Sequence, residues 1–236
     1  MSTLDINAQH KLKRCILRGV SLLVSITCIL AMCTAYIESM KKWANTKEFL
    51  YTTLGFGGLT LVLTIIMLII SFRKDVTEAK IRYAYALSVY IFLNMGIILA
   101  SALAKNKHMV PISIGISILI LLAMSFVGMK AKDLSLWGLP LYCALLGAFV
   151  SQIVLFTLMF TDSIPRTAST IGLNVLSGFL IFVFTMYIAY DVNMFVKNCD
   201  MSFRKCCEAG TFFIWEDFAQ ILMRLIGLMG DIEFQN

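Results

Sequence analysis

The sequence predicts an all-α polytopic membrane protein, in which a single bundle of helices crosses a lipid bilayer. Of the 236 residues, 59% are hydrophobic and 14% are charged, whereas about 25% of the residues of an ordinary soluble domain are charged. The mean hydropathy is +0.84. Because a soluble globule could not bury so much apolar surface, this composition excludes a soluble enzyme, a disordered chain and a secreted disulfide scaffold.

Six apolar stretches are each long enough to cross the hydrocarbon core of a bilayer, which takes about 20 helical residues. These stretches cover residues 16–37, 50–72, 83–104, 110–129, 134–160 and 167–190. The connections between them are too short to hold a soluble domain. We therefore expect a cytosolic tail at 1–15, a transmembrane domain at 16–230 and a short acidic tail at 231–236.

A seventh stretch, at residues 209–230, is apolar but contains the charged residues Glu216, Asp217 and Arg224. Such a stretch either spans the membrane or re-enters it from one side, and the sequence leaves both arrangements open. No internal repeat is evident, which argues against a transporter built from inverted repeats.

The distribution of lysine and arginine predicts a cytosolic N-terminus, because cytoplasmic loops carry an excess of both residues. Thirteen of the 20 lie on the N-terminal side of the predicted bundle, and six lie in the opposite loops. This bias accounts for the formal net charge of +6 without a nucleic-acid partner.

The seven cysteines fit the same topology. Three fall inside predicted spans and four fall on the cytosolic side, the latter being Cys15, Cys199, Cys206 and Cys207. Since stable disulfides are rare in the cytosol, we expect no disulfide framework. Cys206 and Cys207 are then either palmitoylation sites beside the membrane or ordinary reduced thiols.

Three ionisable residues at membrane depth are candidates for function, because charge inside a span is costly. Arg73 ends the second predicted span and Asp191 ends the sixth, and both ends lie at the cytosolic boundary. Asp217 lies about 8 residues into the seventh stretch, which is roughly 12 Å along a helix from the same boundary. We therefore expect the three side chains to converge in the cytosolic third of the bundle.

Two carboxylates in a poorly solvated place cannot both ionise at low cost, so Asp191 and Asp217 are expected to share a proton and to sense pH. Deprotonated, they offer hard oxygen ligands that suit a transient Ca²⁺ ion. Arg73 would form a salt-bridged latch with them. Asp191 could instead be an exposed residue at a span end. Glu216 either faces water or adds a charge to the site, and Arg224 either snorkels to the far interface or faces a polar interior.

The tryptophans and Asn94 are interpreted as structural. We expect no bound cofactor. Trp43, Trp137 and Trp215 lie near span ends, which is typical of side chains that anchor a helix at the membrane interface. Asn94 is interpreted as a contact between helices, with a pore-lining role as the alternative.

Several short motifs, in order along nearly the whole chain, resemble the transmembrane Bax-inhibitor-motif family. Tyr190-Asp191-Val192-Asn193 closes the sixth span, and Asp217-Phe218 is followed by Leu222-Met223-Arg224-Leu225-Ile226-Gly227. Lys132-Asp133-Leu134-Ser135 is similar to the bacterial members, and Arg73 falls where they carry their arginine. Glu216 departs from the pattern, since an apolar residue is usual there.

The resemblance implies seven helices, with six around a central seventh, and a pH-sensitive calcium leak rather than an enzyme. It implies that Asp191 and Asp217 form the proton-sharing pair that gates the pore, assisted by Arg73. In a eukaryote it implies the endoplasmic reticulum or another endomembrane, reduced stored calcium, opposition to apoptosis and apoptosis-regulating membrane proteins as partners. In a bacterium it implies the inner membrane.

Two other functions stay open at this point. One is a non-conducting anti-apoptotic adaptor, in which the aspartates are only structural. The other is an intramembrane aspartyl protease, which is disfavoured because Leu228 replaces the first glycine of the Gly-x-Gly-Asp pattern before Asp231. A retinal protein is disfavoured because the seventh stretch contains no lysine.

Overall fold

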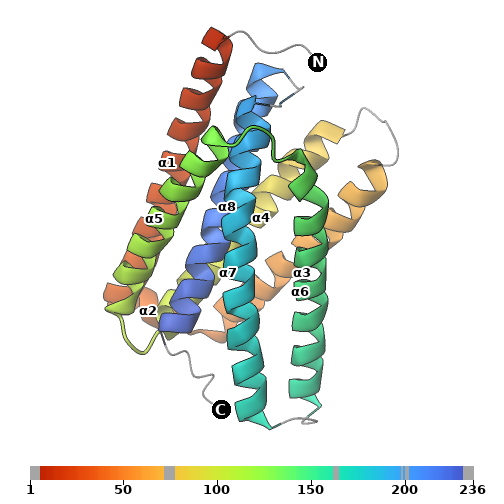
Figure 1. Ribbon diagram of the computed structural model, residues 1–236. Helices are drawn as coiled ribbons and strands as arrows, with labels where there is room; N and C mark the ends of the chain where they lie inside the picture. Colours follow the sequence, from red (N-terminus) through yellow and green to blue (C-terminus); the bar gives the residue numbers. More distant parts are fainter. Residues whose placement is uncertain (1–5, 72–77, 162–164, 198, 200–201, 231–236) are drawn as a thin grey trace.

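The fold is all-helical in the part of the chain that the computed structural model describes, which is residues 6–71, 78–161, 165–197, 199 and 202–230 (Figure 1). The long helices are α1 (Ile6–Tyr36), α3 (Lys47–Ser71), α4 (Glu78–Leu103), α5 (Met109–Lys130), α6 (Gly138–Phe160), α7 (Arg166–Lys197) and α8 (Phe203–Met229). A short helix, α2 (Glu38–Ala44), joins α1 to α3, and a 3₁₀ turn, η1 (Ser135–Trp137), precedes α6. The predicted all-α fold is confirmed.

The exterior of the bundle is suited to lipid. Five described segments are long and apolar enough to cross a membrane, namely Gln9–Tyr36, Ala84–Leu103, Met109–Lys130, Ser135–Leu155 and Thr170–Lys197. Large apolar side chains on three of these helices face outward, with Leu22, Leu119 and Val175 each more than 60% exposed. Such a surface would be unfavourable in water, so the chain is an integral membrane protein.

The first helix begins earlier than the first apolar stretch. α1 starts at Ile6, so part of the predicted tail at 1–15 is helical. Leu12 and Ile16 are buried in the main hydrophobic cluster, and α1 packs along α8. Tertiary packing therefore extends the helix beyond the residues that hydropathy alone selects.

The predicted span at 134–160 begins with a turn rather than with an α-helix. The carboxylate of Asp133 accepts hydrogen bonds from the amide of Ser135 at 2.8 Å and from its hydroxyl at 3.1 Å, directly before and within η1. α6 then begins at Gly138. Pro140 lies in the first turn of α6, where its missing amide hydrogen leaves no hydrogen bond unmade.

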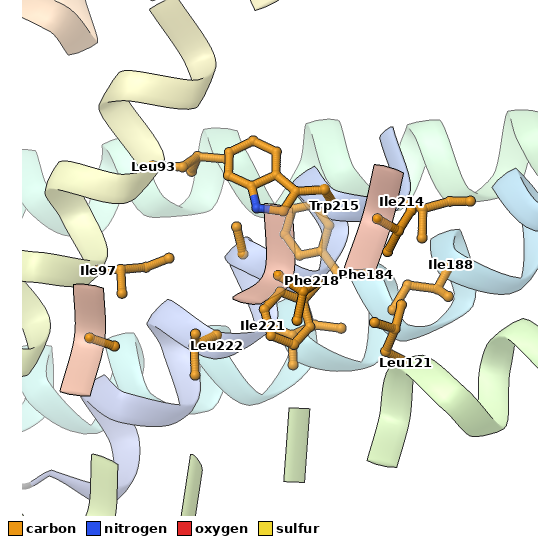
Figure 2. Packing of buried hydrophobic residues seen from close by; sticks show 14 of the residues in the cluster. Leu93, Ile97, Leu121, Phe184, Ile188, Ile214, Trp215, Phe218, Ile221 and Leu222 are labelled. Carbon is orange, nitrogen blue, oxygen red and sulfur yellow. The ribbon is translucent and has the colours of Figure 1, made fainter. Parts of the chain in front are cut away.

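α8 is the central helix, as predicted for the seventh span. It packs against α1, α4, α5 and α7, whereas α3 lies on α4 and α6 lies on α7. Figure 2 shows side chains of α8 between residues of α4, α5 and α7. Its fully buried side chains are Cys206, Trp215, Phe218, Ala219, Ile221, Leu222 and Ile226.

α8 also runs the full length of the bundle. Its 27 residues form one continuous helix, which is about 40 Å long at 1.5 Å per residue. Cys207, near its start, is joined to Cys15 of α1. At its other end, the carbonyl oxygen of Gly230 accepts a hydrogen bond from the amide of Lys105 at 3.0 Å, in the connection from α4 to α5. These contacts lie at opposite ends of the bundle (Figure 1). α8 therefore runs from one end of the bundle to the other, and its crossing of the membrane stays a prediction.

Candidate functional site

Asp191 lies inside a helix rather than at its end. α7 continues past Tyr190, where the predicted span stops, to Lys197. The side chain of Asp191 is 8% exposed, and the neighbouring Val192 and Asn193 are also buried. This burial excludes the alternative of an exposed residue at a span end.

Asp217 approaches Asp191 from the central helix. Its side chain is 6% exposed. Its carboxyl group lies close enough to those of Asp191 and Glu216 for their charges to interact. Tyr187, one turn before Asp191 on α7, lies within electrostatic range of both aspartates. α7 and α8 therefore bring the two carboxyl groups together in the interior of the bundle.

The interior around α8 contains polar atoms whose hydrogen-bonding capacity is unused. Four buried side-chain atoms find no partner among the described residues: the Oδ2 of Asp217, the Nε of Arg224 and the hydroxyls of Ser101 and Ser117. Ser101 lies on α4 and Ser117 on α5, and both helices pack against α8. Unpaired buried polar groups are costly, so a water molecule beside any of these four atoms would lower the free energy of the bundle.

The two accessory charges face the bundle. Glu216 is partly exposed and lies within electrostatic range of Asp191 as well as of Asp217. The guanidinium carbon of Arg224 lies 5.8 Å from the ring centroid of Phe184 on α7. Arg224 therefore points toward a neighbouring helix, as expected for a residue facing the interior. The functional roles of both residues stay predictions.

Two parts of the predicted site are not tested by the geometry. Arg73 lies outside the described residues, so its role as a latch partner stays a prediction. The described residues contain no group of three or more His, Cys, Asp or Glu side chains placed to hold a metal ion. Transient Ca²⁺ binding by Asp191 and Asp217 likewise stays a prediction.

Asn193 has a role that hydropathy did not indicate. Its Nδ2 donates to the carbonyl oxygens of Gly128 at 3.0 Å and Ala131 at 3.1 Å, and its Oδ1 accepts from the amide of Leu134 at 3.1 Å. Lys197 also donates to the carbonyl of Ala131. Asn193 therefore fixes the end of α5 and the turn after it to α7, two residues from Asp191. The signal was its place in the Tyr-Asp-Val-Asn motif.

Trp215 is a core residue, and its predicted role as an interface anchor is wrong. Its side chain is fully buried, and its Nε1 donates to the hydroxyl of Thr27 at 3.0 Å. That hydroxyl donates in turn to the Oδ1 of Asn94 at 3.1 Å. The chain of bonds links α8, α1 and α4, so the predicted interhelical role of Asn94 is confirmed. Trp215 lies near the start of its apolar stretch, but α8 begins earlier than hydropathy indicates.

The expectation that the four cysteines at this end have no disulfides is also wrong. Cys15 is bonded to Cys207, and Cys199 is bonded to Cys206. The physical reason is that residues far apart in the sequence are close in space. α1 packs along α8, which brings Cys15 beside Cys207. Sequence spacing alone carries no sign of this contact.

The fold and this geometry define a polytopic helical membrane protein that holds acidic side chains inside its bundle. The chain matches the family model for the inhibitor of apoptosis-promoting Bax1 over residues 13–234. It therefore belongs to the Bax inhibitor family, a family of anti-apoptotic membrane proteins. The comparison with curated proteins found no match. The family description is that of an inhibitor, and the absence of enzymatic activity stays a prediction.

Proposed function

We propose that the chain is a pH-sensitive calcium leak that lowers stored calcium and thereby opposes apoptosis. One observation carries the proposal: Asp191 and Asp217 are both nearly fully buried and lie within electrostatic range of each other on two packed helices. Two such carboxyl groups respond to pH, and oxygen ligands suit calcium.

In the proposed mechanism, the protonation of the acidic pair sets the packing of α7 against α8. One shared proton lets the two side chains lie together, whereas full ionisation places two like charges in the interior. Arg73 acts as the counter-charge. The unpaired oxygen atoms of Asp217, Ser101 and Ser117 offer ligands to water and cations in the interior around α8.

The proposed setting follows from the lysine and arginine bias and from the family. The N-terminus faces the cytosol. The membrane is the endoplasmic reticulum or another endomembrane in a eukaryote and the inner membrane in a bacterium. Apart from lipid and Ca²⁺, apoptosis-regulating membrane proteins are the proposed partners, without nucleic acid.

The test is calcium flux into proteoliposomes that contain the purified protein, measured from about pH 5.5 to about pH 8, where a proton-sharing pair titrates. Wild type is expected to show flux above empty liposomes that changes with pH. Because an amide mimics a protonated carboxyl group, Asp217→Asn should keep, at every pH, the flux that wild type reaches at the acid end. Asp191→Asn should also lose pH dependence. Glu48→Gln, at an exposed carboxyl group of α3, is the matched control.

Three outcomes would contradict the proposal. A wild-type pH profile in Asp217→Asn would exclude the proton-sharing gate. An absence of flux at every pH would favour the non-conducting adaptor. Peptidase activity that is lost in Asp191→Asn would instead support an intramembrane protease.

A further inference from the structure

Four cysteines from three segments meet at one end of the bundle. Cys15 of α1 is bonded to Cys207 of α8, with their Cα atoms 5.9 Å apart. Cys199, in the connection from α7 to α8, is bonded to Cys206, with their Cα atoms 6.2 Å apart. These four residues, named the cysteine cluster here, tie the first turns of α8 to α1 and to the segment that precedes α8.

The two cysteines of each disulfide in the cysteine cluster differ in their exposure to solvent. Cys206 is fully buried and Cys207 is 8% exposed, whereas Cys15 and Cys199 are partly exposed. Each disulfide thus joins a partly exposed cysteine to a buried one. A thiol from solution would attack the sulfur of Cys15 or Cys199, and the buried Cys207 or Cys206 would leave.

Burial disfavours a leaving thiolate, and the local charge offsets part of that cost. Cys206 and Cys207 lie in the first two turns of α8, which begins at Phe203. The positive end of a helix dipole stabilises a thiolate there. Lysine and arginine residues flank the cluster in sequence, with Arg14 before Cys15 and Lys205 before Cys206. Stabilisation of the leaving thiolate speeds thiol–disulfide exchange.

We propose that the cysteine cluster is a thiol–disulfide regulatory site, which fixes the start of α8 to α1 when oxidised and frees it when reduced. The lysine and arginine bias places this end of the bundle in the cytosol, where disulfides that do form are usually transient and redox-sensing. The inference does not rest on calcium conduction.

The reaction balances with a monothiol of the glutathione class as the reductant. Its thiolate bonds to the sulfur of Cys15, the Cys15–Cys207 bond breaks, and Cys207 leaves as a thiolate that takes up a proton. A second thiolate attacks the reductant's sulfur in this mixed disulfide and releases Cys15 as a thiol. Each protein disulfide thus gains two electrons and becomes two thiols, and two molecules of the reductant become one reductant disulfide. The Cys199–Cys206 pair reacts in the same way, and the reductant's disulfide drives the reverse reaction.

The first test counts thiols in the folded protein. Protein equilibrated with glutathione buffers of varied reduced-to-oxidised ratio is quenched with acid, alkylated and weighed as the intact chain. Oxidised protein should carry three alkyl groups, on Cys28, Cys33 and Cys143, and the number should rise to seven as the buffer becomes reducing. Three groups at every ratio would overturn the proposal in favour of permanent structural bonds, and seven at every ratio would show that no disulfide forms.

The second test asks whether the bonds control the start of α8. Hydrogen exchange of residues 203–211 should be roughly tenfold faster in reduced than in oxidised wild type, because a local tether is lost. Cys15→Ser should exchange fast under oxidising buffer, and Cys28→Ser is the control that should match wild type. Equal exchange in oxidised and reduced wild type would overturn the proposal, even if Cys15→Ser failed to fold.

Discussion

At the scale of single residues, Asn193 is the side chain that connects the acidic site to its surroundings. It uses its amide group three times, for the carbonyls of Gly128 and Ala131 and for the amide of Leu134. All three partners belong to the end of α5 or to the turn beyond it. A shift of α7 near Asp191 must therefore move the end of α5 as well.

Replacement of Asn193 by alanine should destabilise the protein by about 1–3 kcal/mol, because buried backbone groups would lose their partners. The measurement is the unfolding temperature in detergent. Asn174→Ala is the matched control, since Asn174 is exposed on the same helix. Equal unfolding temperatures for the two variants would show that the hydrogen bonds of Asn193 are not required.

The bonds that join Trp215, Thr27 and Asn94 give a second prediction at this scale. Thr27→Val keeps the shape of the side chain but leaves the Nε1 of Trp215 and the Oδ1 of Asn94 unpaired in the core. The expected loss of unfolding free energy is about 1–3 kcal/mol. Thr52→Val, at an exposed threonine of α3, should change little. A Thr27→Val variant as stable as the control would mean that another group satisfies these atoms.

At the scale of helices, the contact between α5 and α7 depends on a glycine. A Cβ atom on Gly128 would collide with the backbone carbonyl of Ala189 and would lie 3.0 Å from the Cβ of Val192. Neither neighbour is the flexible end of a side chain. The close approach of the two helices therefore requires glycine at this position, beside the part of α7 that carries Asp191.

Gly128→Ala should destabilise the bundle by about 1–3 kcal/mol, the usual cost of forcing extra volume into a packed core. Gly115 lies on the same helix with open space around its Cα. Gly115→Ala should be neutral or slightly stabilising, because alanine is the better helix former. Thermal unfolding of the two variants compares them directly, and a stable Gly128→Ala protein would show that α5 and α7 can separate at no cost.

The sequence predicted the bounds of a helix well where hydropathy alone determines where that helix begins and ends. α5 matches the apolar stretch at 110–129 within one residue at each end. α7 and α8 were predicted too short, because Asp191, Asn193 and Cys206 are polar or reactive residues that tertiary packing buries. Hydropathy counts such residues as span ends, whereas the fold buries them, with hydrogen bonds for Asn193 and a disulfide for Cys206.

The predicted site was limited in the same way. Charge counting and helix length predicted a similar membrane depth for Asp191 and Asp217. Both arguments need only the sequence around each residue, so they could be made without the fold. The pairing of Cys15 with Cys207 joins residues separated by 192 positions. That contact, like the one between Trp215 and Thr27, depends on which helices are neighbours, and neither spacing nor composition determines the order of helices around α8.

At the scale of the whole molecule, the seven long helices each cross the bundle, so the two ends of the described chain emerge on opposite sides. We expect epitope tags at the N- and C-termini to differ in protease protection in sealed membrane vesicles, with the N-terminal tag on the cytosolic face. Tags of equal sensitivity in intact vesicles would contradict the full crossing of α8. Detergent permeabilisation, which should make both tags sensitive, is the control.

The central position of α8 also has a consequence for biogenesis. Chains emerge from the ribosome from the N-terminus, so α8 is made after the other six long helices. Until it arrives, α1, α4, α5 and α7 lack the helix that all four contact. Until α8 is inserted, the nascent protein therefore lacks the contacts that join these four helices through the centre of the bundle.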